Sequence, residues 1–103
     1  MRNITASEFD KVINGEKIVI VDFWASWCGP CKMLAPVLEK VSETLTDYDF
    51  VKVDVDAEQE LAIKNQIYSI PTLVMYKAGK EIVRKSGYMN ESELTNFILN
   101  STK

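Results

Sequence analysis

The chain of 103 residues is organised around one stretch, KIVIVDFWASWCGPCK, residues 17–32. The first half of this stretch is an apolar run rich in β-branched residues, which predicts a strand buried on both faces. The second half holds the only two cysteines of the chain, Cys28 and Cys31, separated by Gly29 and Pro30. We therefore expect a central strand that leads directly into a Cys-x-x-Cys pair at the start of a helix.

The spacing of the two cysteines favours redox exchange over a structural role. Two thiols three residues apart at the start of a helix lie on one face, close enough to form a small disulfide ring and to open it again. As a structural crosslink this bond would be weak, because closing a loop of roughly four residues removes only about 2 kcal/mol of unfolded-chain entropy. In a reducing compartment, a lone Cys pair is more often catalytic or metal-binding than structural.

A metal site is the main competing use of the pair. A closed zinc site needs four Cys or His ligands, and the chain has two Cys and no His. A four-thiolate iron–sulfur cluster fails on the same count, and covalent haem attachment would need His where Lys32 stands. A metal bridged between two chains remains open, but within one chain we expect no metal.

Length and composition limit the classes of function. A chain of this length is expected to form a single domain, residues 1–103, that buries a core without crosslinks. With a net charge of −3 it has no cationic surface for nucleic acid or acidic lipid, so neither nucleic acid nor a membrane is an expected partner. The N-terminal residues lack the apolar core of a signal peptide, which predicts a cytoplasmic protein.

The segments around the Cys pair predict alternating helices and strands. Ser7, with an acidic residue three positions later, resembles the N-cap of a short first helix. Apolar residues at helical spacing follow the Cys pair as far as Leu45, and Pro36 is expected to kink that helix. Residues 50–56 alternate between apolar and polar types, which predicts a second strand parallel to the central one.

The C-terminal part of the chain predicts two more helices and a hairpin. Residues 58–65 have the pattern of a short helix, and a Gly-containing turn joins two strand candidates, residues 72–76 and 81–86. Asn90 and Glu93 resemble a capping box at the start of the last helix.

This order of elements, together with several motifs, resembles the thioredoxin family. The segment VDFWASWCGPCK, residues 21–32, is similar to the family's active-site segment, and Ile70-Pro71-Thr72 stands where the family has a similar motif before the hairpin. Further similar landmarks are Pro36, Lys52, Asp54, Gly79 and Gly87. The resemblance covers nearly the whole chain and implies an α/β thioredoxin fold, with a central five-stranded mixed β-sheet flanked on both faces by four helices.

The resemblance also implies a function. The protein is expected to be an enzyme, a thiol–disulfide oxidoreductase that reduces protein disulfides through a reversible Cys28–Cys31 dithiol/disulfide couple. It implies a redox carrier with no bound cofactor, re-reduced by a thioredoxin reductase that uses NADPH. Its partners would be that reductase and disulfide-containing target proteins, and we expect the protein to be a monomer.

The two cysteines are expected to have different roles. Cys28 is the better nucleophile, because the N-terminus of a helix stabilises a thiolate. Cys31, one turn further, would be the resolving thiol. Pro30 fits the first helical turn, where its missing N–H costs little. Gly29 and Pro30 favour a reductant, since proteins that resemble the oxidising members of this fold carry His between the cysteines.

Asp22 is a carboxylic acid in an otherwise apolar strand. Either it reaches solvent at the end of the strand, or it is a buried acid with a raised pKa that accepts the proton of Cys31. Lys52, on the neighbouring strand, could modulate that acid or could simply be solvated.

Four residues are expected to bind target proteins: Trp27, Ile70, Pro71 and Gly87. The frequency of cis X–Pro bonds in folded proteins predicts a trans bond before Pro71. The resemblance implies instead a cis bond facing the Cys pair, with the backbone around Ile70 pairing with an extended target segment.

Two alternatives to a reductase remain open. One is an oxidase or isomerase, against which the Gly29-Pro30 pair argues. The other is a redox-regulated binding module whose reduced form holds a partner protein.

Overall fold

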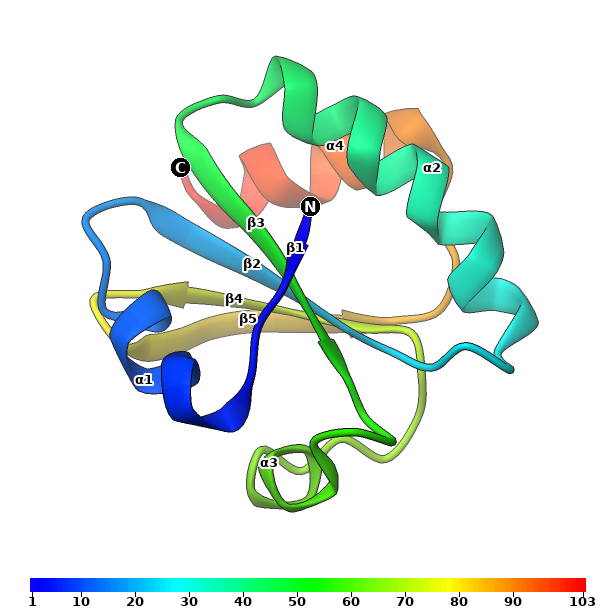
Figure 1. Cartoon of the computed structure of the whole chain (residues 1–103). Coiled ribbons are helices and arrows are strands. Elements are labelled where there is room, and N and C mark those ends of the chain that lie inside the picture. The colour runs from blue at the N-terminus through cyan, green and yellow to red at the C-terminus, as the bar shows by residue number, and fades with distance from the viewer.

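The computed structural model describes residues 1–103, which form five strands and four helices (Figure 1). The strands are β1 (Arg2–Asn3), β2 (Ile18–Trp24), β3 (Tyr48–Asp54), β4 (Thr72–Lys77) and β5 (Lys80–Ser86). The helices are α1 (Ala6–Ile13), α2 (Gly29–Thr44), α3 (Gln59–Lys64) and α4 (Glu91–Ser101).

The five strands form one mixed sheet in the order β1-β3-β2-β4-β5. β3 pairs in parallel with both β1 and β2, whereas β4 runs antiparallel to both β2 and β5. Strand β2 therefore lies at the centre of the sheet, and the five-stranded mixed sheet expected from the resemblance is confirmed.

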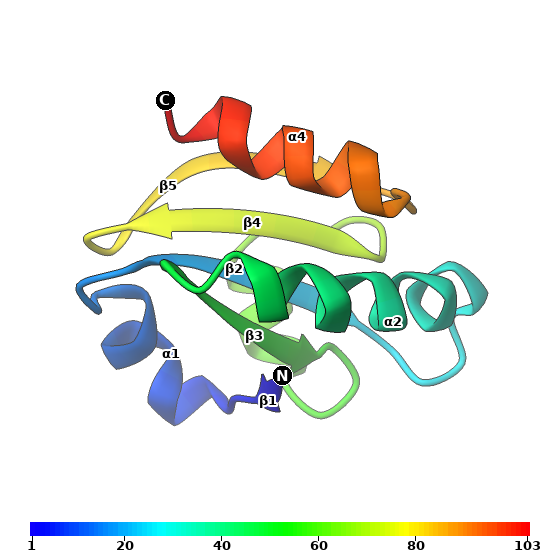
Figure 2. The same cartoon turned by 90° about the horizontal axis from the view of Figure 1, so that it is seen from above.

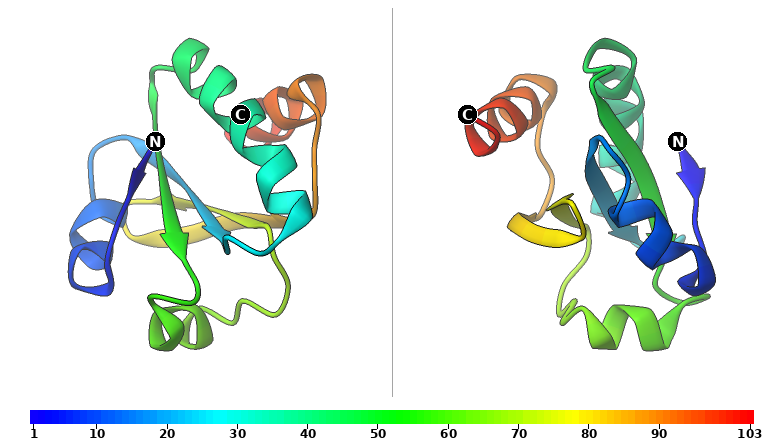
Figure 3. Two further views of the ribbon diagram at one scale, coloured as in Figure 1. Left: turned by 45° about the vertical axis from the view of Figure 1, so that its right-hand side comes forward. Right: turned by 90° about the vertical axis from the view of Figure 1, so that its left-hand side faces the viewer.

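The helices cover both faces of this sheet. In Figure 1, α2 and α4 lie on one face and α1 and α3 on the other, and Figure 2 shows α2 and α4 on the same side. Figure 3 shows α2 running beside α4. Each face has its own apolar core: Phe9 of α1 and Leu61 of α3 contribute to one, and Leu38 of α2 and Leu94 of α4 contribute to the other.

Strand β2 is buried along its length, as its unbroken apolar run predicts. Its residues alternate between the two cores, with Val21 and Phe23 in the core under α1 and α3, and Ile20 in the core under α2 and α4. Asp22 has the same parity as Ile20 and therefore points toward α2. The carboxyl group is thus placed inside the protein beneath the helix that carries the cysteines.

The structure differs from the predictions at the start of α1, in the bounds of β3 and in one additional strand. The N-cap of α1 is Thr5 and not Ser7, because Glu8 reaches back to accept a hydrogen bond from the Thr5 backbone N–H at 2.9 Å. Strand β3 begins and ends two residues earlier than predicted. It ends at Asp54 because that side chain accepts hydrogen bonds from the backbone N–H groups of Asp56 and Ala57, which turns the chain.

The third difference is strand β1, which no sequence pattern indicates. It is only two residues long, too short to show a strand period, and pairing with β3 holds it in place. The backbone N–H of Ile4 continues this pairing with a hydrogen bond to the Lys52 carbonyl at 2.8 Å.

Helix α2, the β4–β5 hairpin and the start of α4 agree with the prediction. Helix α2 continues through Pro36 to Thr44, and the kink expected at Pro36 stays a prediction. Strands β4 and β5 form the predicted hairpin, whose turn uses Gly79 at φ +82°, a conformation that glycine adopts easily. At the start of α4, Asn90 and Glu93 form the predicted capping box.

Candidate active site

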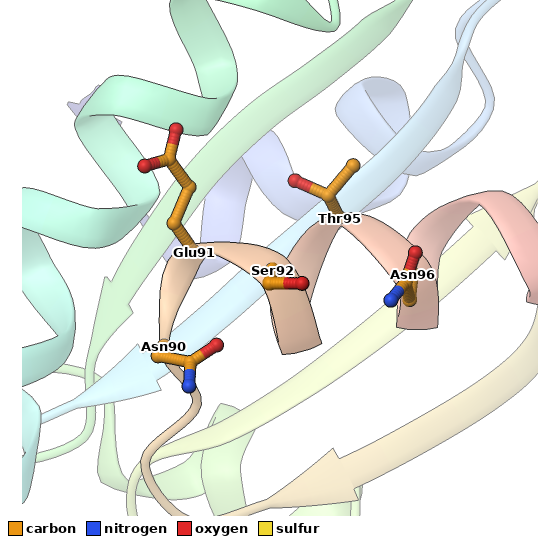
Figure 4. Close-up of a pocket in the computed structure, with 5 residues that line it drawn as sticks. All are labelled: Asn90, Glu91, Ser92, Thr95 and Asn96. Carbon is orange, nitrogen blue, oxygen red and sulfur yellow. The ribbon is translucent and has the colours of Figure 1, made fainter.

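One hollow on the surface does not hold the expected chemistry. It has a volume of about 510 Å³ and lies against the first turns of α4 (Figure 4). Five polar side chains line it: Asn90, Glu91, Ser92, Thr95 and Asn96. None of them is a thiol or a base paired with a nucleophile, and Asn90 is already engaged in capping the helix. The expected chemistry lies instead at the cysteine pair.

Cys28 and Cys31 are joined by a disulfide at the start of α2. Their Cα atoms are 5.2 Å apart, and both side chains are buried. Cys28 is the N-cap residue of α2, and its sulfur accepts a hydrogen bond from the backbone N–H of Cys31 at 3.2 Å. This contact and the positive end of the helix stabilise negative charge on the Cys28 sulfur. Gly29 and Pro30 form the first turn, where Pro30 needs no hydrogen-bond partner.

The loop before β4 brings backbone groups next to this disulfide. The Ile70–Pro71 bond is cis, as the resemblance implies and the general frequency does not. The carbonyl oxygen of Ile70 lies 3.8 Å from the Cys28 sulfur. The Pro71 carbonyl accepts a hydrogen bond from the Gly87 N–H at 2.8 Å, which links this loop to the end of β5. Of the four predicted target-binding residues, Ile70 thus contacts Cys28, and Pro71 and Gly87 are joined to it by the chain and by this hydrogen bond.

Trp27, the fourth of these residues, lies on the surface. Its side chain is 68% exposed, and its indole N–H donates a hydrogen bond to Asp56 Oδ2 at 2.8 Å. Trp27 also lines a shallow hollow of about 190 Å³, together with Val55, Ala62, Ile67, Tyr68, Ser69 and Ile70. Most of these side chains are apolar, so the disulfide adjoins a largely apolar surface.

Asp22 lies beneath the helix that carries the cysteines. It is 3% exposed, and its Oδ1 atom has no hydrogen-bond partner. Burial raises the pKa of this carboxyl group from 3.8 to about 7, and the positive charge of Lys52 opposes the rise. The structure therefore buries Asp22, and the alternative of a carboxylate that reaches solvent is wrong. The role of Asp22 as acceptor of the Cys31 proton stays a prediction.

A small cavity of about 90 Å³ lies between Asp22 and Cys31. Its lining includes Asp22, Cys31 and Lys52, with Trp24, Lys32 and Ala35 completing the wall. The cavity is mostly apolar, but it has room for a water molecule, and the side chains of Asp22 and Lys52 supply polar groups in its lining. The structure thus brings the predicted acid Asp22, the predicted resolving thiol Cys31 and the predicted modulator Lys52 to one place.

Lys52 does not form an ion pair with Asp22. Its ammonium group lies over the ring of Trp24, 4.9 Å from the ring centroid. The indole N–H of Trp24 in turn donates a hydrogen bond to Asn3 Oδ1 at 3.0 Å.

Three residues near the site were missed by the sequence analysis. Asp56 fixes the exposed Trp27, Asn3 fixes Trp24, and Tyr68 is 89% exposed beside the apolar hollow. Asp56 is 29 positions from Trp27 in the sequence, and Asn3 is 21 positions from Trp24. Local sequence spacing does not predict contacts between residues so far apart. Tyr68 could have been noted as an aromatic residue close to Pro71, but its exposure needs the structure.

No helix of the structure combines the length and the apolar character that crossing a membrane requires. No group of three or more His, Cys, Asp or Glu side chains is gathered where they could hold a metal ion.

Comparison with known proteins identifies the family. A family model described as Thioredoxin matches residues 1–100. The chain is 52% identical over 83 residues to Thioredoxin-1 of Saccharomyces cerevisiae, a match that covers 81% of each chain. It is 44% identical over 90 residues to the bifunctional thioredoxin reductase/thioredoxin of Mycobacterium leprae, covering 86% of this chain and 20% of that protein.

Solved structures agree with the sequence matches. Thioredoxin of Plasmodium falciparum has a TM-score of 0.90 and 42% identity, and the match covers 97% of this chain and 98% of that one. Together with the Cys28–Cys31 disulfide at the start of α2, these matches show that the chain belongs to the thioredoxin family of protein thiol–disulfide oxidoreductases.

Proposed function

We propose that the protein works in the reducing direction, transferring two electrons from its Cys28–Cys31 dithiol to the disulfides of other proteins. The observation that carries the exchange chemistry is the position of the Cys28 sulfur, and the Gly29-Pro30 pair, with no His between the cysteines, favours the reducing direction. The Cys28 sulfur caps α2, where a thiolate is stabilised, and it faces the Ile70 carbonyl beside an apolar surface on which a target can dock.

The reaction proceeds through one mixed disulfide. The Cys28 thiolate attacks one sulfur of the target disulfide, and the other target sulfur leaves as a thiolate. Cys31 then loses its proton and attacks the Cys28 sulfur, which closes the Cys28–Cys31 bond and releases the second target thiolate. The target gains two electrons and the protein's dithiol loses two, so the protein must be reduced again before the next cycle.

Asp22 is proposed to accept the proton of Cys31 in the second step. A group with a pKa of about 7 can take up and release a proton near neutral pH. The cavity shared by Asp22 and Cys31 supports a transfer through water. Lys52 is proposed to modulate this acid through its charge, since it opposes the effect of burial on the pKa of Asp22.

Target proteins are proposed to dock in an extended conformation across Trp27, Ile70, Pro71 and Gly87. An extended segment could pair with the backbone around Ile70 and place its disulfide over Cys28. The apolar side chains of the hollow beside Trp27 would then be covered by the target.

Replacing Trp27 with alanine tests this docking surface. We expect KM for a protein disulfide to rise about tenfold with kcat nearly unchanged, because a central exposed aromatic residue often dominates binding energy. Leu99→Ala is the matched control, since Leu99 is also an exposed apolar residue but lies on α4. Equal effects of the two substitutions on KM, or a loss confined to kcat, would remove Trp27 from the docking surface.

The proposal includes a reductase partner that uses NADPH. The M. leprae relative, by its name, combines a thioredoxin reductase with a thioredoxin in one protein, which supports a partner of that kind for this chain. We also propose that the protein acts in the cytoplasm as a monomer.

The direction of electron flow can be tested against glutathione. We expect the Cys28–Cys31 disulfide to persist in the presence of a large excess of reduced glutathione, because a reductant holds its electrons less tightly than the glutathione pool does. The fraction of oxidised protein is measured by alkylation and mass spectrometry after equilibration at known glutathione ratios. A protein that is mostly dithiol at ratios where glutathione itself is largely oxidised would instead be an oxidase or isomerase.

A further inference from the structure

Four side chains form a connected group across β1, β3 and β2. In the sheet register, Lys52 is the partner of Asn3 on β1 and of Asp22 on β2. Residues that are directly opposite in a sheet point to the same face, so all three side chains lie on the α2 side. Trp24 is two positions after Asp22 on β2 and shares that face.

The Trp24 side chain contacts both Asn3 of β1 and Lys52 of β3. Its indole N–H donates a hydrogen bond to Asn3 Oδ1 at 3.0 Å, although β3 lies between the two strands. The Lys52 ammonium group lies over the same ring, 4.9 Å from its centroid, within the range of a cation–π contact. The ring is therefore fixed from one side by Asn3 and provides a binding position for Lys52.

In this arrangement Asp22 has no ion-pair partner. Asp22 Oδ1 is buried and has no hydrogen-bond partner, and Lys52 lines the same cavity without forming an ion pair with it. A buried carboxylate and a nearby ammonium group attract each other strongly. The contact with the Trp24 ring competes with that attraction.

We propose that Asn3 and Trp24 form a brace that holds the Lys52 ammonium group away from Asp22, and that this brace sets the pH at which Asp22 titrates. Asn3 and Trp24 are thus positioning residues that act through Lys52. The groups facing Asp22 are Lys52 from β3 and Cys31 and Lys32 from α2, while β4 places the uncharged Leu73 opposite it. Only Lys52 is held by the brace.

The functional value of the brace rests on the proposed role of Asp22 as the acceptor of the Cys31 proton. With Lys52 paired to it, Asp22 would remain ionised well below neutral pH and would take up a proton less readily. With Lys52 held over the Trp24 ring, Asp22 titrates near the pH at which Cys31 attacks the mixed disulfide.

The test is a carbon-13 NMR titration of the Asp22 carboxyl group in the oxidised protein, where neither cysteine titrates. The Asp22 signal is assigned by its absence in Asp22→Asn. We expect Asn3→Ala to lower the titration midpoint by about half a pH unit, because the freed ammonium group moves toward the carboxylate. Trp24→Phe, which keeps a ring but removes the N–H donor, should shift the midpoint in the same direction.

Lys52→Met supplies the decisive comparison. Alone it should raise the Asp22 midpoint, since a nearby positive charge has gone. In the Lys52→Met background, Asn3→Ala should have no effect, because there is no ammonium group for the brace to hold. Asn96→Ala, at an exposed asparagine on α4, is the matched control and should leave the midpoint unchanged.

Two results would overturn the brace. One is an Asp22 midpoint that stays the same or rises in Asn3→Ala; the other is a lowering that persists without Lys52. Asn3 is exposed and its strand is held by backbone pairing, so the variant is expected to fold. The titration involves no target protein, so a failed brace is distinguished from a failed proton-acceptor role, which would appear only in the rate of disulfide reduction.

Discussion

Cys28→Ser is expected to abolish the reduction of protein disulfides, with a loss of at least about a thousandfold in rate. A serine hydroxyl cannot replace a thiolate as the attacking group in disulfide exchange, and Cys31 is buried one turn inside α2. The measurement is the rate of insulin disulfide reduction with dithiothreitol as the electron donor, corrected for the rate without protein.

Cys31→Ser is the matched variant for this experiment. It keeps the attacking sulfur at the N-cap of α2 and removes only the thiol that resolves the mixed disulfide. We expect a rapid first attack on the target followed by a stop, with a covalent complex accumulating. Substantial turnover by Cys28→Ser would show that the roles of the two cysteines are assigned wrongly.

Asp22→Asn is expected to stabilise the oxidised protein at about pH 8 by roughly 3–4 kcal/mol. The physical reason is desolvation. Burial raises the pKa of Asp22 from 3.8 to about 7, so the native state at alkaline pH must keep a charge out of water. Asparagine has a similar shape and carries no charge.

The sign of the pH dependence follows from the same shift. Because the pKa of Asp22 is higher in the folded protein, the folded state binds the proton more tightly than the unfolded chain. The associated stability is complete below about pH 4 and is lost as pH rises through about 7. The difference between Asp22→Asn and wild type should therefore be near zero at about pH 4 and largest above about pH 8.

Urea unfolding of both proteins at several pH values measures this difference. Glu8 and Glu81 have lowered pKa values and also make stability depend on pH, but both groups are present in each protein and cancel in the comparison. The same variant should reduce disulfides more slowly near neutral pH, because the proton acceptor has gone. A stability difference that does not vary with pH would contradict a buried, ionisable Asp22.

Much of this architecture could be predicted because its causes are local in sequence. The apolar run of β2 predicts a buried central strand, since only such a strand tolerates apolar side chains on both faces. The Cys28-Gly29-Pro30-Cys31 segment predicts a helix start with two thiols on one face, and the structure places both there. The resemblance to a family added the fifth strand and the cis bond before Pro71, which neither periodicity nor general frequencies indicate.

The parts that could not be predicted depend on contacts between distant segments. The Trp27–Asp56 and Trp24–Asn3 hydrogen bonds join residues brought together only when β1, β2 and β3 align. The burial of Asp22 likewise depends on helix α2 lying over it, and the sequence alone left two readings of that carboxylic acid. The position of Lys52 over an aromatic ring, and not on the acid, is also a result of tertiary structure.

The most direct measurement of the central claim is whether the Cys28 sulfur, the only thiol left in Cys31→Ser, forms a mixed disulfide with the target. Reduced Cys31→Ser is mixed with a protein disulfide, the products are alkylated, and peptides of the covalent complex are identified by mass spectrometry. The account predicts one predominant mixed disulfide, in which Cys28 is joined to a target cysteine, and its release on addition of dithiothreitol. Failure of the reduced variant to form any covalent complex, under conditions where wild type reduces the same target, would contradict the account.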